Sequence, residues 1–153
     1  MVEPISVTQN IKAPASLVWE MVSDLPRMGD WSPENQGGQW IGGGSGPAAG
    51  AKFRGENQHE KKSWKTTVTV LDATPAERFS FRSSIMGVGL AEWSYDIEPT
   101  PEGCCVTETW DDVRPGWFKP LSKLATGVAD REGYTRAGMQ ETLEKLAQAA
   151  ETD

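Results

Sequence analysis

The sequence lacks long apolar runs and is poor in the residues that build metal sites and disulfide scaffolds. No stretch reaches the roughly 18 consecutive apolar residues that a membrane-spanning helix requires. Only two cysteines, Cys104 and Cys105, and one histidine, His59, occur among 153 residues. A disulfide between adjacent cysteines is strained, so we expect two free thiols. A zinc site needs several Cys or His ligands, so we expect no metal, and we expect no cofactor.

The cysteine content predicts the compartment, and the chain length predicts the number of domains. Free thiols are typical of a reducing compartment, which makes the cytoplasm the expected location. Residues 1–10 contain neither the basic nor the apolar segment of a signal peptide. A length of 153 residues fits one domain, so we expect residues 1–153 to fold as a single unit.

Positive charge is also scarce. The chain has 15 Lys and Arg residues against 22 Asp and Glu residues, for a net charge of −7. Residues 1–76 carry 7 basic and 8 acidic side chains, whereas residues 77–153 carry 8 and 14. Neither half attracts phosphate, so we expect no nucleic-acid partner, no anionic-membrane binding and no membrane span.

The hydrophobic pattern changes period along the chain. Alternating apolar and polar residues predict strands over residues 3–11, 39–41, 51–59, 63–71, 78–85, 90–98 and 104–113. Spacings of three and four predict a short helix over residues 14–25, a further helical turn over 27–31, and a long C-terminal helix from about 117 onward. Pro120 requires a break or a first turn near its own position.

These elements indicate an α+β fold. Short connections between consecutive strands imply antiparallel pairing, and one face of such a sheet is apolar and needs a cover. The C-terminal helix is the one predicted element long enough to cover it. We therefore expect a curved antiparallel sheet of six to seven strands wrapped around that helix, with two short helices after the first strand.

This order of elements resembles the helix-grip fold of the Bet v 1-like/START-like (SRPBCC) superfamily. Within it, the chain is similar to the bacterial polyketide cyclase/dehydrase and lipid-transport family. Four segments carry the resemblance: VWEMVSD at residues 18–24, DWSPE at 30–34, GAKFRGEN at 50–57 and GMQETLEKL at 138–146. The resemblance implies a fold and a ligand cavity, but no particular reaction.

The strand alternation itself suggests a cavity. It places many rings on the inner face of the sheet, whereas the helix offers small residues such as Gly127, Ala129, Gly133 and Gly138. Rings on one wall and missing side chains on the other leave a slot for a small molecule. The expected ligand-binding residues are Trp31, Phe53, Asn57, Trp64, Phe81, Ser83, Trp93, Tyr95, Trp110 and Val128. Any single aromatic among them could instead be an ordinary core residue.

Glu108 is the candidate catalytic residue. It shares the inner face with Val106 and Trp110, where desolvation would raise its pKa. It could then be a general acid or base, or could donate a hydrogen bond to a ligand oxygen. The alternatives are a structural ion pair or a strand register shifted by one residue, which would turn Glu108 outward.

Two other features invite a functional interpretation but lack the context for one. His59 lies where a strand ends and is expected in an exposed loop rather than at a catalytic site. The glycine-rich residues 42–50 include a match to a dinucleotide-binding pattern, but no helix opens there. We expect this segment to be a flap over the cavity mouth, with Trp31 and Trp40 nearby.

The leading hypothesis is a monomer or homodimer that binds a hydrophobic, polyketide- or lipid-like small molecule. The alternative is a polyketide aromatase/cyclase or dehydratase that uses Glu108 as acid or base, with Tyr95 or Ser83 holding a carbonyl oxygen. An inward arginine would assist such chemistry, but Arg54 and Arg82 both fall on the outer face. A protein-interaction module is the third possibility, and an exposed apolar patch would favour it.

Overall fold

The computed structural model describes residues 4–32, 35–42, 46–126 and 131–152. Seven strands form a single antiparallel sheet in the order β1-β7-β6-β5-β4-β3-β2. The elements are β1 (Ile5–Ile11), α1 (Ala15–Ser23), the 3-10 helix η1 (Leu25–Asp30), β2 (Asn35–Ile41), β3 (Lys52–His59), β4 (Lys62–Thr74), β5 (Arg78–Ile85), β6 (Val88–Thr100), β7 (Gly103–Asp112), α2 (Lys119–Thr126) and α3 (Arg131–Glu151). This is the expected helix-grip α+β fold.

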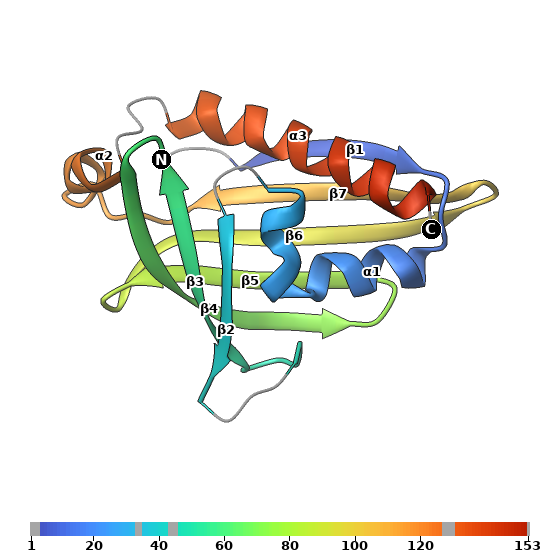
Figure 1. Ribbon diagram of the computed structural model, residues 1–153, viewed down its shortest axis with the longest axis horizontal. Helices are drawn as coiled ribbons and strands as arrows, with labels where there is room; N and C mark the ends of the chain where they lie inside the picture. The colour runs from blue at the N-terminus through green and yellow to red at the C-terminus, as the bar shows by residue number, and fades with distance from the viewer. Residues whose placement is uncertain (1–3, 33–34, 43–45, 127–130, 153) are drawn as a thin grey trace.

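The curved sheet holds α3 against its concave face, alongside β1 (Figure 1). Alternation along each strand sends one set of side chains toward the helix, as the sequence predicted. Phe79 and Val106 from the sheet and Leu143 and Leu146 from α3 are fully buried there. The apolar face of the sheet and the apolar stripe of α3 therefore share one core.

The two short helices after β1 cover one end of this core. Val18 and Val22 of α1 and Leu25 of η1 are buried against the sheet. The Trp19 indole N–H donates a 2.9 Å hydrogen bond to the backbone carbonyl of Arg78, which ties α1 to β5. Met28 of η1 reaches the edge of the pocket that lies farther along the concave face.

Two strands depart from the predicted limits for local reasons. β4 continues to Thr74 through an irregularity between Val70 and Asp72, and the extra residue Leu71 is 45% exposed. β2 begins at Asn35 rather than at residue 39. Its Gly38 has φ +147°, and a Cβ there would lie 2.0 Å from the Arg54 carbonyl oxygen. A glycine-rich strand has no side-chain alternation, so its early residues escaped prediction.

The expected single C-terminal helix is wrong at its start. The spacing of residues 117–124 belongs to a separate helix, α2, with Pro120 in its first turn. Trp117, Leu121 and Leu124 are 65%, 51% and 72% exposed rather than part of the core. Within the described part of the chain, no helix is long and apolar enough to cross a membrane.

Candidate functional site

A pocket of about 160 Å³ lies between the concave face of the sheet and the first half of α3, at the end opposite α1. It is partly open to solvent. Its lining residues are Met28, Ser32, Asn57, Trp64, Thr66, Val68, Phe81, Ser83, Ile85, Leu90, Ala91, Trp93, Tyr95, Glu108, Trp110, Arg114, Phe118, Tyr134, Thr135, Gly138, Met139 and Thr142. Apolar side chains supply most of the wall surface, and several Ser, Thr, Asn, Glu and Arg side chains supply the rest. Apolar surface with placed polar groups is the usual composition of a small-molecule site.

Most of the predicted site residues come together at this pocket. Those that line it are Asn57, Trp64, Phe81, Ser83, Trp93, Tyr95, Glu108 and Trp110. Trp31 and Phe53 do not line it and belong to the packed core instead. The Phe53 ring packs edge-on against Trp40, with centroids 5.3 Å apart. Val128 lies outside the described residues.

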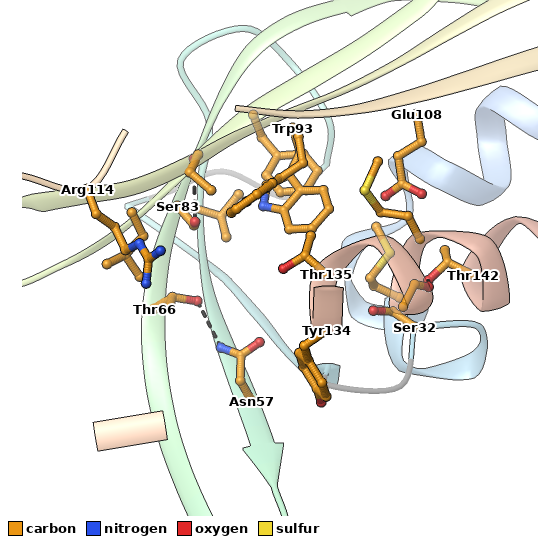
Figure 2. A pocket seen from close by; sticks show the side chains of 18 of the residues that line it. Ser32, Asn57, Thr66, Ser83, Trp93, Glu108, Arg114, Tyr134, Thr135 and Thr142 are labelled. Carbon is orange, nitrogen blue, oxygen red and sulfur yellow. Dashed lines mark hydrogen bonds between the residues drawn. The ribbon is translucent and has the colours of Figure 1, made fainter. Parts of the chain in front are cut away.

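Rings from adjacent strands give the pocket its shape. Trp93 of β6 and Trp110 of β7 are opposite each other in register, and their ring centroids lie 6.4 Å apart. Trp93 also pairs with Phe81 of β5 on its other side. Figure 2 shows Trp93 projecting from the sheet toward α3, where Thr135 lies below it. These cross-strand neighbours point to the same face of the sheet and form an aromatic part of the wall, with the Trp93 and Trp110 rings inclined by 47°.

The α3 side of the pocket was largely missed by sequence reasoning. Thr135, Gly138, Met139 and Thr142 all line it, and their spacing of three or four places them on one helix face. The small residues that the sequence predicts for this wall are Gly127, Ala129, Gly133 and Gly138. Gly127 and Ala129 lie outside the described residues, Gly133 is exposed and does not line the pocket, and Gly138 does line it. The spacing of Thr135, Gly138, Met139 and Thr142 was the signal available in the sequence.

A buried carboxyl–phenol pair sits in the wall. Tyr95 and Glu108 are opposite each other on β6 and β7, and each side chain is 2% exposed. The Tyr95 hydroxyl donates a 2.9 Å hydrogen bond to Glu108 Oε2. Glu108 Oε1 is buried and has no hydrogen-bond partner among the described residues. Figure 2 shows the carboxyl group pointing from the sheet toward α3.

This environment keeps Glu108 protonated. Burial raises its pKa to about 8, although the hydrogen bond from Tyr95 acts in the opposite direction. Burial, reinforced by the neighbouring Glu108, raises the pKa of Tyr95 well above its ordinary value. Because Oε2 accepts from Tyr95, the carboxyl proton belongs on Oε1. The pocket wall therefore contains an O–H donor with no acceptor among the described residues, and leaving such a donor unpaired costs ~1–3 kcal/mol.

An arginine also reaches the pocket, contrary to the expectation drawn from Arg54 and Arg82. Arg114 lines it and is held by Asp112 through Nε at 2.8 Å and Nη2 at 2.7 Å. Burial alone would raise the pKa of Asp112, but the hydrogen bonds and charge of Arg114 outweigh it and lower that pKa. Arg114 has the same strand parity as Glu108 and Trp110, so alternation carried past residue 112 would have found it.

His59 and the glycine-rich segment do not contribute to the lining. The expectation that His59 lies in an exposed loop is wrong, because it is half-buried at the end of β3, with its Nδ1 3.1 Å from the Tyr134 hydroxyl. The described part of the glycine-rich segment, residues 46–50, is not in the pocket wall, and the Gly50 N–H donates to the Val70 carbonyl. A flap over the mouth is therefore wrong for this part of the segment, as is a place there for Trp40.

A metal centre is not indicated by the described side chains. Across residues 4–32, 35–42, 46–126 and 131–152, no three His, Cys, Asp or Glu residues cluster closely enough to hold a metal ion. Among the polar side chains of the pocket, the Asn57 amide donates to the Thr66 hydroxyl at 3.1 Å (Figure 2). The pocket thus offers hydrogen-bonding groups and rings.

The chain belongs to the polyketide cyclase/dehydrase and lipid transport family, whose pattern matches residues 4–151. No curated protein matches the sequence. The Polyketide_cyc-like protein Cgl2372 from Corynebacterium glutamicum is 28% identical, with a TM-score of 0.66 over 95% of this chain and 90% of that one.

More distant structures share the fold alone. Protein NE0264 from Nitrosomonas europaea is 14% identical, with a TM-score of 0.69 over 95% of this chain and 92% of that one. The di-domain ARO/CYC protein StfQ from the steffimycin biosynthetic pathway is 12% identical, with a TM-score of 0.74 over 97% of this chain and 50% of that one. The present chain therefore corresponds in length to about half of the di-domain protein.

Proposed function

We propose that the protein binds a hydrophobic small molecule, polyketide- or lipid-like, in the pocket between the sheet and α3. The ligand class that fits best carries an apolar ring system and a carbonyl or similar acceptor oxygen. The observation that carries the proposal is Glu108 Oε1, a buried polar atom in the pocket wall that has no hydrogen-bond partner among the described residues. A ligand oxygen would supply the missing acceptor, while rings would cover Trp93 and Trp110.

The size of the pocket supports a ligand of modest bulk. A closed cavity of about 150 Å³ admits one benzene molecule, and this pocket measures about 160 Å³ and is partly open. One or two rings would fill the enclosed part, and a longer molecule would extend to solvent past Phe118. Each buried CH₂ contributes about 0.8 kcal/mol, so a ring system alone provides useful affinity.

The donor at Glu108 makes ligand choice depend on pH. Methyl naphthyl ketone and isopropylnaphthalene have nearly the same shape, but only the ketone accepts a hydrogen bond. At pH 6 we expect the ketone to bind about tenfold more tightly, because it relieves an unsatisfied donor. Above pH 8 the carboxyl ionises and repels the ketone oxygen, so the preference disappears. Titration of tryptophan fluorescence at both pH values measures this.

Glu108→Gln is the matched control for that experiment. Its amide group can still donate to the ligand while accepting from Tyr95, but it does not ionise. The variant should keep the ketone preference at pH 6 and at pH 9. Equal affinities for the two compounds at pH 6, or no quenching by either, would refute the proposed binding mode.

A second candidate function, a polyketide aromatase/cyclase or dehydratase activity, is favoured by the placement of Arg114 beside the same pocket. Below about pH 8, Glu108 would serve as a proton donor rather than as a base. Turnover of a poly-β-ketone should then fall at least about 100-fold in Glu108→Gln, which still binds ligand but cannot transfer its proton. Unchanged turnover in that variant would exclude this role.

The proposed compartment is the cytoplasm. Cys104 and Cys105 are both free thiols, one buried and the other half-buried. This is the state expected in a reducing environment.

A further inference from the structure

We propose that the α2 end of the protein is a docking surface for an anionic lipid bilayer. The surface consists of Trp117 and α2, which lies beside the tip of the β3–β4 hairpin (Figure 1). It joins the open pocket, because Arg114 and Phe118 immediately before α2 line the pocket wall. The proposal concerns the outside of the protein and does not depend on which ligand the pocket takes.

The apolar part of this surface is unusually exposed. Trp117, Leu121 and Leu124 are 65%, 51% and 72% exposed. Leu121 and Leu124 are three residues apart and share one side of α2, and Trp117 lies in the turn just before the helix. The Trp117 ring contacts the Phe118 ring, with centroids 5.7 Å apart. Because Phe118 lines the pocket, the exposed tryptophan lies next to the pocket lining. A short helix with tryptophan and leucine on one side suits the headgroup–acyl boundary of a bilayer.

The charge around the apolar residues is positive, although the chain as a whole is acidic. Residues 60–65 and 111–126 hold six of the 15 Lys and Arg residues and three of the 22 Asp and Glu residues. One of these acids, Asp112, is buried and paired with Arg114. Lys61, Lys62 and Lys65 on the hairpin are exposed, and α2 packs against β4 beside them. Lys119 remains 40% exposed, with its amino group 4.0 Å from Asp112.

The net charges of the two halves predict no binding to anionic membranes, and the proposal departs from that prediction because it rests on this local excess. The two basic segments lie in different halves of the sequence, so the half-chain charges average them with acidic residues elsewhere. The fold brings them to one end of the molecule (Figure 1). Within a Debye length of about 8–10 Å, a bilayer senses this end rather than the whole chain.

The combination of apolar and basic residues favours a bilayer over other occupants. A two-fold dimer through this surface would place the basic residues of both copies face to face, which is repulsive. A nucleic acid would satisfy the lysines but leave Trp117, Leu121 and Leu124 in water. Anionic lipid satisfies both, because its acyl region accepts the apolar side chains and its headgroups attract the lysines.

Vesicle sedimentation tests the proposal with the full chain. We expect the protein to bind phosphatidylcholine vesicles containing about 30 mol% phosphatidylglycerol at least about tenfold more strongly than pure phosphatidylcholine vesicles. Binding should weaken when salt rises from about 0.05 M to about 0.5 M. Trp117→Ser with Leu124→Ser, and separately Lys61→Glu with Lys62→Glu, should each reduce binding at least about tenfold.

Matched controls distinguish binding through this surface from nonspecific adsorption to vesicles. Leu71→Ser removes an exposed leucine on β4, and Lys52→Glu reverses an exposed lysine at the other end of β3, so both should bind vesicles as the wild type does. Far-ultraviolet circular dichroism verifies that each variant is folded. Equal loss in the controls, or no preference for anionic vesicles, overturns the proposal. Self-association that Trp117→Ser with Leu124→Ser abolishes would assign the surface to a second copy and also overturn it.

Discussion

Raising the pH from 5 to 8.5 should lower the free energy of unfolding by about 4 kcal/mol through Glu108 alone. The folded protein holds this proton until about pH 8, whereas the unfolded chain releases it near 4.5. Between these values the folded state binds more protons, so its stability falls as pH rises, by about 1.36 kcal/mol per pH unit. Urea unfolding followed by tryptophan fluorescence, at steps between pH 5 and pH 9, measures the slope.

Glu108→Gln should remove this slope, because its side chain stays neutral throughout. The variant should resemble the wild type at pH 5 and be more stable than it at pH 9. Glu98→Gln changes an exposed glutamate on β6 and should leave the wild-type slope in place. Parallel stability curves for the wild type and Glu108→Gln would contradict the buried, protonated state of this carboxyl.

Gly138→Leu should abolish ligand binding while leaving the protein folded. Gly138 lies on the α3 face that lines the pocket, so a leucine there would occupy the space proposed for the ligand. Leucine is also a better helix former than glycine by about 1 kcal/mol, which favours a folded variant. We expect at least about a 100-fold loss of affinity for methyl naphthyl ketone, measured by tryptophan quenching.

Ala137→Leu provides the control for that substitution. It introduces the same side chain one residue earlier on α3, at an exposed position outside the pocket wall. Its affinity should match that of the wild type. If Gly138→Leu bound the ketone normally, the ligand would have to lie elsewhere, and the pocket assignment would fail.

The sequence predicted well those features that depend on local alternation. Tyr95, Glu108 and Trp110 were assigned to the inner face from strand parity alone, and all three are buried there. Alternation shows which face of the sheet a residue lies on, but it does not show whether that part of the face is packed or open. Phe53 shares the inner face, yet it lies in the core, where β2 places Trp40 against its ring. Whether an inward residue packs or lines a space depends on which element covers it.

The helical segments were harder to predict for the same reason. The spacing of Trp117, Leu121 and Leu124 indicates an apolar side but does not say what that side contacts. We expected the sheet, and the structure leaves these residues exposed. Arg114 was missed because alternation was not continued beyond the end of the predicted strand. Both errors concern tertiary placement, which periodicity alone does not encode.

A crystal structure of the protein with methyl naphthyl ketone tests the central claim most directly. The account predicts the naphthalene ring between Trp93 and α3, with the ketone oxygen about 2.5–3.0 Å from Glu108 Oε1. A space closed by the protein's own side chains, or a ketone bound only on the outer surface, would contradict it.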